Sequence, residues 1–270
     1  MHQTSFTSLI ITYNSANEAL NLLADLYLYK PANKVIVIDN ASRDKTADLI
    51  QKYYPQVQLI KNLTNVGYAK AVNQGFDLCD TKYVLLLNPD IRITSPRLFS
   101  EAEACLKQGK QIAATAPLQF KSNTPQGKQI NFTWSYLAPN AFRVYLSFLV
   151  QRRQVFTKPV RVTFLNAGCL FIRRSAFEQI GKLNEKYFMY GEEPDLFLKI
   201  KRHGFKCYLL PNAAVIHYRE RSLKSIPKLQ CLQIKFQAVW NIADALITGW
   251  TNILIDKAAV FKYQHVDGKR

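Results

Sequence analysis

The chain has 270 residues, 48% of them hydrophobic, so it can bury a large core in one domain or in two closely packed halves, and a disordered tail protein is excluded. Its 36 Lys and Arg residues against 19 Asp and Glu residues give a formal net charge of +17. This charge indicates an anionic partner such as nucleic acid, an acidic membrane face or a phosphorylated substrate, although a basic bias of an ordinary soluble surface explains it equally well.

The first 120 residues alternate short apolar runs with amphipathic stretches. The apolar runs, each typical of a strand, are SLIITYN, KVIVIDN, VQLIKN, YVLLLNPD and QIAATAP. Between them, helical spacing predicts helices over 16–29, from 44, over 68–78 and over 96–106. Strands that are apolar on both faces and alternate with helices predict a largely parallel sheet covered on both sides, which is an α/β architecture.

Polar residues follow four of these strands at the point where each strand ends. In a parallel α/β sheet the ligand crevice lies beyond the carboxyl ends of the strands. The polar strand ends are Thr12, Tyr13 and Asn14, then Asp39 and Asn40, then 62–67, then 88–90. Any one of them has an ordinary explanation, because Asn, Asp and Thr cap helices and form turns. Four at one edge of the sheet favour a binding site.

The segment LNPD ends a buried strand with an amide, a ring and a carboxylate. Pro89 cannot donate a ladder hydrogen bond, so it ends regular pairing and fixes the chain direction before Asp90. A carboxylate that projects into a polar crevice is suited to hold a divalent cation, and Asn88 can bond a ligand without charge. The tripeptide is also a common turn, and on these residues alone that alternative stays open.

The second half is less regular. KSNTPQGKQ indicates an exposed loop, VTFLNAGCLFIRRSAFEQIG predicts a strand pair followed by a helix, and GEEPDLFLKIKRHGF predicts a loop followed by a helix that ends at Gly204. From Leu229 onward, apolar residues at helical spacing predict one or two amphipathic C-terminal helices.

Three acidic residues crowd into four positions at the start of the second predicted helix, namely Glu192, Glu193 and Asp195. Pro194 suits the first helical turn, and acids are favoured at the positive end of a helix. A charged helix start without a catalytic role is therefore one explanation. A carboxylate kept ionised by a helix N-terminus can also serve as a general base.

Six segments occur together in order: TYNSA, VIVIDNASRDKT, NVGYAKAVNQG, LLLNPD, NAGCLFIRRSAFEQIGKLNEKYFMYGEEPDL and VIHYRERS. Over residues 8–222 this set resembles glycosyltransferase family 2, especially its bacterial rhamnosyltransferase-like members. The resemblance implies a GT-A fold with a Rossmann-like, mostly parallel sheet. It implies a catalytic domain over 1–222, with a nucleotide-sugar-binding half (1–120) and an acceptor and base half (121–222), followed by a C-terminal helical extension (223–270).

The resemblance also implies which residues bind the nucleotide sugar. Asp39 is expected to face the pyrimidine, and the small residues at 167 and 168 are similar to the family's donor-sugar wall, where they allow close approach of the ring. The full set that the resemblance implies is Thr12, Tyr13, Asn14, Asp39, Asn65, Gly67, Asn73, Asn88, Asp90, Ala167 and Gly168.

A divalent cation, Mg or Mn, is implied because LNPD stands where many relatives have Asp-x-Asp. Asp90 matches the metal-contacting carboxylate, whereas Asn88 replaces the first acid, a variant common in this branch. His217 matches a histidine that completes the metal site in some relatives, although a lone histidine is more often structural. The ion would neutralise the diphosphate leaving group.

For the general base, Glu193 stands at the position where the family has Asp, with Glu192 before it. Glutamate is one methylene longer, so its carboxylate reaches the acceptor only if the helix start lies slightly farther back. Asp195 matches a second acid that often follows in this branch, as a substitute base or a structural cap. Removal of the acceptor proton by Glu193 and a single displacement would invert the anomeric configuration.

The sequence thus predicts a metal-dependent inverting hexosyltransferase in cell-surface polysaccharide synthesis. The donor would be a dTDP- or UDP-linked sugar, with rhamnose chosen from the resemblance alone, and the acceptor a glycan or lipid-linked saccharide. The alternative is a catalytically idle sugar-nucleotide or glycan-binding subunit, which the departures at Asn88 and Glu193 leave open. A nucleic-acid partner is not expected, because there is no aromatic RNA-recognition signature, zinc-finger spacing or recognition helix.

A cytoplasmic location is expected, because no run reaches about 18 apolar residues and the N-terminus lacks a basic region followed by a long apolar one. FRVYLSFLVQRR and the C-terminal stripe with Trp240 and Trp250 interleave basic, aromatic and aliphatic residues, which is typical of attachment to an anionic membrane face. A helix packed on the catalytic domain explains the stripe equally well. The five unclustered cysteines are expected to be reduced core residues.

Overall fold

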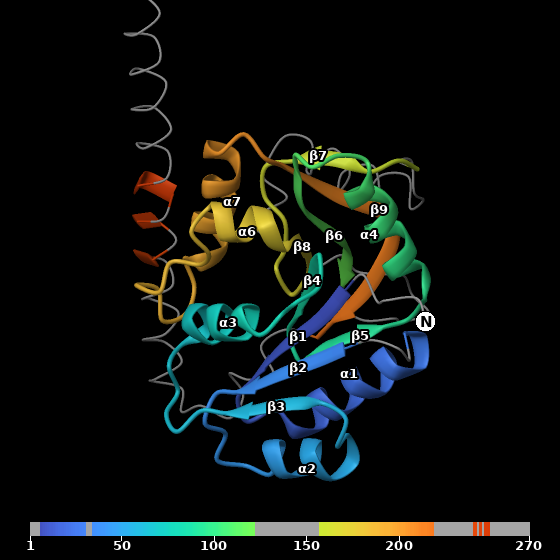
Figure 1. Cartoon of the computed structure of the whole chain (residues 1–270), viewed down its shortest axis with the longest axis vertical. Helices are drawn as coiled ribbons and strands as arrows, with labels where there is room; N and C mark the ends of the chain where they lie inside the picture. Colours follow the sequence, from blue (N-terminus) through green and yellow to red (C-terminus); the bar gives the residue numbers. More distant parts are fainter. Residues whose placement is uncertain are drawn as a thin grey trace, which may run out of the picture.

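The computed structural model describes residues 6–30, 34–121 and 157–218, together with residues 240, 241, 243, 244 and 246–248. Its centre is a nine-stranded mixed sheet with helices packed on both faces (Figure 1). The predicted α/β class is confirmed. The segments 122–156 and 219–239, which contain most of the predicted loop and the start of the apolar stripe, lie outside the described residues.

The first half follows the predicted alternation of strands and helices. Its elements are β1 (Phe6–Thr12), α1 (Ala16–Tyr29), β2 (Lys34–Asp39), α2 (Thr46–Tyr53), β3 (Gln58–Lys61), α3 (Tyr68–Asp77), β4 (Tyr83–Leu87), β5 (Ile91–Ile93), α4 (Arg97–Lys107) and β6 (Ile112–Phe120). Nothing in the sequence pattern marked β5, because three residues are too few to show a period.

The second half adds β7 (Val160–Val162), β8 (Cys169–Arg173), α6 (Arg174–Gln179), α7 (Glu192–Arg202) and β9 (Lys206–His217). Of the strand pair predicted from Val162 onward, only the second strand, β8, forms as predicted; β7 ends at Val162 and pairs with β9, whereas β8 lies between β4 and β6. Helix α7 ends as predicted, with Gly204 in a left-handed conformation at φ +76°.

Strand order in the sheet is β3-β2-β1-β4-β8-β6-β9-β5, with β7 beside β9. Strands β1 to β4, β6 and β9 run in one direction, and β5, β7 and β8 run in the other. The carboxyl ends of β1, β2, β4 and β9 therefore point to the same edge, which brings the polar strand ends of the first half close to the end of β9.

Two hydrophobic layers cover the sheet. Helices α1, α2 and α4 pack on one face, and α3, α6 and α7 pack on the other. Strand β8 is buried at all five positions because both of its faces are covered, and the ring of Phe171 packs edge-on against Phe6 at a centroid distance of 5.2 Å. Burial of each such side chain contributes about 1.5 to 3 kcal/mol to the free energy of folding. Four cysteines are buried and unpaired, as predicted, and Cys231 lies outside the described residues.

A buried carboxylate on α1 holds β5 in place. Asp25 accepts hydrogen bonds from Arg92 Nε at 2.7 Å, from Arg92 Nη2 at 2.9 Å and from the backbone N–H of Ile93 at 3.0 Å. Strand β5 begins at the residue after Asp90. This bidentate ion pair therefore fixes the chain directly beyond the predicted metal ligand.

The described residues between 240 and 248 adopt helical conformation, as predicted, and lie beside the loop that precedes α7 (Figure 1). Within the parts of the chain that the structure describes, no helix combines the length and the apolar character needed to cross a bilayer.

Candidate functional site

Asp39 at the end of β2 is held by a network of short contacts. Its Oδ1 atom accepts hydrogen bonds from Thr12 Oγ1 at 3.1 Å and from Ser42 Oγ at 2.6 Å, and its Oδ2 atom accepts one from the Ser42 backbone N–H at 3.0 Å. Ser42 Oγ also accepts from the backbone N–H of Asn14 at 2.9 Å. The structure thus brings three of the predicted donor-site residues together, with Ser42, which the sequence did not mark, between them.

Asn40 organises the next loop. Its Oδ1 atom accepts from Asn62 Nδ2 and from the backbone N–H of Val66, both at 3.1 Å, and its Nδ2 atom donates to Asn65 Oδ1 at 2.8 Å. Asn65 Oδ1 also accepts from the Gly67 backbone N–H at 3.0 Å. Asn65 and Gly67 are therefore placed at the same sheet edge as Asp39 by a side chain that the predicted set did not include.

Gly67 occupies a position that only glycine suits. Its φ is +87°, and a Cβ atom built there would lie 2.8 Å from the carbonyl oxygen of Phe188. The following residue, Tyr68, donates its backbone N–H to the same carbonyl at 2.8 Å. This close approach joins the start of α3 to the segment that precedes α7.

The side chain of His217, at the end of β9, lies next to Asp90. Its Nε2 atom lies 3.2 Å from Asp90 Oδ1, and its Nδ1 atom lies 2.8 Å from Gln119 Oε1. The Gln119 amide nitrogen donates to the Asn166 carbonyl at 3.0 Å, which turns Oε1 toward the histidine. Because that oxygen only accepts, Nδ1 carries the hydrogen and Nε2 faces the carboxylate.

Gly168 leaves the space that this histidine occupies. A Cβ atom on Gly168 would lie 2.5 Å from Cε1 and 2.7 Å from Nδ1 of His217. The glycine carbonyl accepts the backbone N–H of Asn88 at 2.9 Å, and its own N–H donates to Asn166 Oδ1 at 3.0 Å. Gly168 is thus packed between the loop after β4 and the histidine, and Ala167, beside it, is buried.

The Asp90 and His217 pair fits a divalent cation site that is only partly made by protein. A histidine whose second ring nitrogen is fixed by a carbonyl-type oxygen is the arrangement usual for metal-ligating histidines. Among the described residues no three His, Cys, Asp or Glu side chains converge as a metal cluster. An ion at this pair would therefore take its remaining ligands from substrate oxygens and water.

The acidic turn begins α7. Tyr190 and Gly191 have φ values of +63° and +100°, so the chain turns sharply before Glu192, and the three carboxylates lie within the helix rather than in the loop before it. Burial, and secondly the charge of Glu193, raises the pKa of Glu192 to about 8. Its Oε2 atom is buried and has no hydrogen-bond partner among the described residues. Glu192 is therefore a neutral acid at neutral pH.

The other two acids differ in environment. Asp195 is buried, and its Oδ2 atom lies 3.0 Å from Lys199 Nζ, an ion pair whose angle does not satisfy hydrogen-bond geometry. Glu193 is partly exposed, unlike either neighbouring acid. Of the three, Glu193 is the carboxylate that an incoming substrate reaches most easily.

Tyr68 links the acidic turn to the loop after β4, and the sequence did not mark it. Its hydroxyl donates to Asn88 Oδ1 at 3.3 Å. Burial raises its pKa well above 10, and the charges of Glu193, Glu192 and Asp90 raise it further, so the phenol stays protonated. The sequence feature that could have identified Tyr68 is its position directly after the Asn-x-Gly turn.

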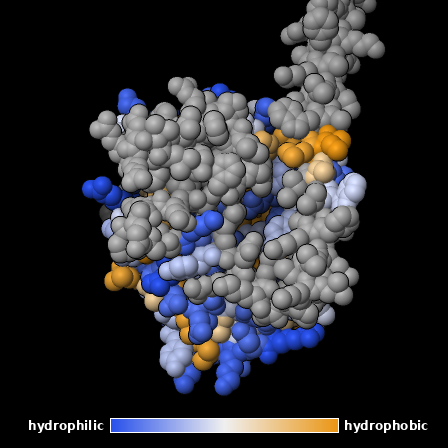
Figure 2. Space-filling model, turned by 180° about the vertical axis from the view of Figure 1, so that it is seen from behind, coloured by the Kyte–Doolittle hydropathy of each residue, from blue (hydrophilic) through white to orange (hydrophobic). Residues whose placement is uncertain are grey.

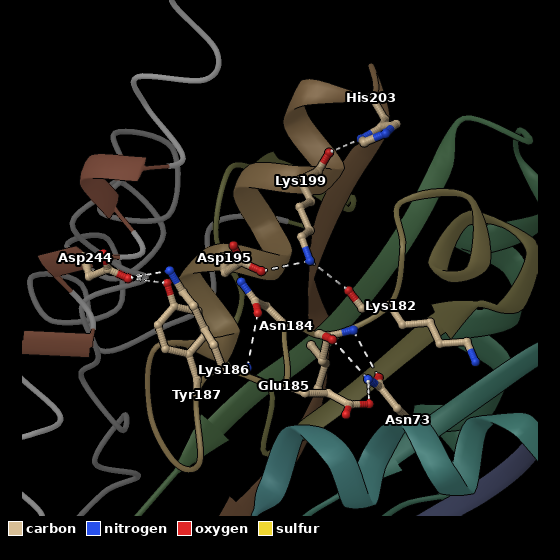
Figure 3. Close-up of polar contacts among 11 residues, drawn as sticks. Asn73, Lys182, Asn184, Glu185, Lys186, Tyr187, Asp195, Lys199, His203 and Asp244 are labelled. Atoms are coloured by element: carbon tan, nitrogen blue, oxygen red, sulfur yellow. Dashed lines mark hydrogen bonds and ion pairs between the residues drawn. The ribbon is translucent and has the colours of Figure 1, made fainter.

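The side chain of Asn73 bonds the segment after α6. Its Nδ2 atom donates to the Leu183 carbonyl at 3.0 Å and to Glu185 Oε1 at 2.9 Å, and its Oδ1 atom accepts the Leu183 N–H at 3.0 Å (Figure 3). Both ends of the amide hold the segment after α6.

Tyr13, another predicted donor-site residue, is partly exposed at the carboxyl end of β1.

Residues 7–181 match the family model described as glycosyl transferase family 2. The chain is 27% identical over 234 residues to N-acetylglucosaminyl-diphospho-decaprenol L-rhamnosyltransferase of Mycobacterium tuberculosis, and the match covers 78% of this chain and 75% of that protein. It is 21% identical over 229 residues to rhamnosyltransferase WbbL of Escherichia coli, over 80% of this chain and 84% of that one.

Solved structures share the fold. Mannosyltransferase PcManGT from Pyrobaculum calidifontis, in complex with GDP-Man and Mn2+, matches with a TM-score of 0.60 at 16% identity, over 94% of this chain and 75% of that chain. GalNAc-T7 with UDP, GalNAc and Mn2+ matches with a TM-score of 0.62 at 17% identity, over 79% of this chain but only 43% of that chain, so this chain spans less than half of its length. The expected GT-A fold is confirmed.

Proposed function

Since the chain belongs to glycosyltransferase family 2, we propose that it is an inverting enzyme that moves a sugar from a nucleoside-diphosphate donor to a hydroxyl of a lipid-linked saccharide or glycan in polysaccharide synthesis. The printed names of the two rhamnosyltransferase relatives support rhamnose as the sugar. The carrier we propose is dTDP or UDP, and a solved structure of the same fold holds UDP. The printed name of the mycobacterial relative supports an acceptor carried on a polyprenyl diphosphate.

One observation supports the proposal: the Tyr68 hydroxyl bonds the loop that carries Asp90 and lies within electrostatic reach of the partly exposed Glu193 carboxylate. Its hydroxyl bonds Asn88, two residues before Asp90, and its pKa responds to Glu193 and to Asp90. A displacement at an anomeric carbon needs a base on the acceptor side and charge neutralisation on the diphosphate side. These groups supply both.

The division of roles follows from burial and charge. Glu193 removes the proton of the acceptor hydroxyl, because it is the accessible acid of the turn. Glu192 is buried and protonated, so it adds no second negative charge beside the base. Asp90 and His217 would hold Mg2+ or Mn2+, which would supply charge neutralisation of the departing diphosphate. Asp39, Thr12 and the turn at Asn65 and Gly67 form the side that binds the nucleoside.

Release of free nucleoside diphosphate from a panel of nucleotide sugars, with Mn2+ or Mg2+ against chelator, tests the proposal. Glu193→Gln is expected to lower the rate by about 10²- to 10⁴-fold and to leave nucleotide binding intact. Glu178→Gln, on exposed α6 surface, serves as the matched control. A Glu193→Gln rate equal to the wild-type rate would refute the base assignment. Nucleotide binding without turnover, even with membrane extract as acceptor, would identify an idle binding subunit.

Membrane attachment is also part of the proposal. Phe188, Trp240 and Ile247 are large apolar side chains with exposed fractions of 54%, 61% and 65%, and Figure 2 shows hydrophobic surface at the helical segment 240–248. Together with the net charge of +17 they support peripheral binding to the anionic inner face of the cell membrane. Trp240→Asp is expected to weaken cosedimentation with anionic vesicles, whereas Leu28→Asp on α1 is not. Equal loss in both variants would contradict a role for this helix.

A further inference from the structure

The segment 182–191 leads directly into the acidic turn, and neighbouring elements hold it from three sides (Figure 3). From α3, the amide of Asn73 bonds the backbone of Leu183. From α7, Lys199 Nζ donates to the Lys182 carbonyl at 3.2 Å. The third side is the helical segment 240–248, which is separated from the turn by about fifty residues of sequence.

The contacts from 240–248 are polar and specific. Asp244 Oδ2 accepts the hydroxyl hydrogen of Tyr187 at 2.7 Å and lies 2.8 Å from Lys186 Nζ. Asn241 Nδ2 donates to the Met189 carbonyl at 3.0 Å. Since 241 and 244 are three positions apart, both side chains project from the same helix face. One face of the helix therefore contacts the segment at Lys186, Tyr187 and Met189.

These contacts extend to the last residue before the acids. A Cβ atom on Gly191 would lie 3.0 Å from both the Cβ and the carbonyl oxygen of Asn241. Gly191 adopts its positive φ without strain, whereas Tyr190, at φ +63°, is a non-glycine residue in the left-handed region, a conformation that persists where surrounding contacts enforce it. The helix therefore packs against Gly191, one of the two left-handed residues that set the direction of the first turn of α7.

We propose that Asp244 and Asn241 are positioning residues for the transfer, which hold the turn at 186–191 so that the Glu193 carboxylate stands within reach of the acceptor hydroxyl. This inference rests on the proposed function of Glu193. A displacement of about 1 Å in a reacting group can cost about 100-fold in rate. Asp244 is half exposed, so its ion pair adds little to global stability, and its loss acts on rate rather than on folding.

The test measures donor turnover by nucleoside diphosphate release in Asp244→Ala, Asp244→Asn and the control Asp48→Ala, which removes an exposed ion pair on α2. We expect Asp244→Ala to lower kcat about 10- to 100-fold and to change the KM for the donor much less, because Asp244 contacts Lys186 and Tyr187, and the segment stays joined to the donor edge by the Tyr68 N–H bond to the Phe188 carbonyl. Asp244→Asn keeps an acceptor for the Tyr187 hydroxyl and should recover most of the rate. Asp48→Ala should match wild type.

A second arm separates positioning from a general defect. If Asp244 acts through Glu193, Asp244→Ala should cost nothing more in a Glu193→Gln background. Amide hydrogen exchange over 186–193 should speed up in Asp244→Ala, with the melting temperature unchanged. A wild-type kcat in Asp244→Ala, or an equal loss in both backgrounds, would overturn the proposal. If Glu193→Gln itself is fully active, the base assignment fails as well, so the two failures are distinguishable.

Discussion

The Nε2 atom of His217 lies 3.2 Å from Oδ1 of Asp90, while Nδ1 of the same ring lies 2.8 Å from Oε1 of Gln119. A neutral amide on β6 thus decides which ring nitrogen faces the carboxylate. That amide is itself oriented by the Asn166 carbonyl. The candidate cation site is therefore built from two strands, β6 and β9, and two loops, and among these four residues Asp90 and His217 are the side chains proposed to hold the ion.

Gln119→Leu should weaken the response to metal. Leucine fills a similar volume but removes the acceptor that fixes His217, and loss of such outer partners typically costs about 10- to 100-fold in metal affinity or activity. The measurement is the Mn2+ concentration needed for half-maximal nucleoside diphosphate release. Thr115→Val, a substitution at a buried hydroxyl of the same strand that has no hydrogen-bond partner among the described residues, is the control. An unchanged Mn2+ requirement in Gln119→Leu would separate Gln119 from the site.

Glu192 should make stability fall as pH rises. Its pKa is raised from 4.5 to about 8 in the folded state, so between these values the native protein holds a proton that the unfolded chain has lost. The contribution of Glu192 to the free energy of unfolding is fully present below about pH 4.5 and is lost between there and about pH 8, a change of at most about 5 kcal/mol. Glu192→Gln, which cannot ionise, should be more stable than wild type at pH 9 and equal to it near pH 5. Denaturant unfolding at both values checks this, and parallel curves would contradict it.

Gly168→Ala should disable the site without adding any new chemistry. The added methyl would lie 2.5 Å from His217 Cε1, so the ring must move away from Asp90. We expect a large loss of metal-dependent turnover and a lower melting temperature. In a His217→Ala background the same methyl has no ring to displace, so the further loss of stability should disappear. If Gly168→Ala lowers the melting temperature equally with and without the His217 ring, the added methyl group clashes with a different residue.

The features that could be predicted from sequence are those that depend on local pattern. Apolar runs marked β1 to β4, and the rule for parallel sheets placed Asp39 and Asp90 at one edge. Gln119 escaped prediction, and Asn40 was expected only as a polar strand end, because their roles depend on distant partners: Gln119 meets His217 across 98 positions. Tyr68 resembles any aromatic residue at a helix start. Asn73 was expected at the donor site from its motif, whereas its amide holds the 183–185 segment, a contact that no spacing rule anticipates.

The strand order has a consequence for how such a protein can change its substrate. Strand β8, from the second part of the chain, is inserted between β4 and β6 of the first 120 residues, and the Tyr68 backbone N–H bonds the Phe188 carbonyl. Residues 1–120 transplanted from a relative would have to rebuild four strand ladders and a backbone contact at once. Replacement of individual side chains at the sheet edge would leave these ladders intact, whereas exchange of the whole segment 1–120 would disturb all of them.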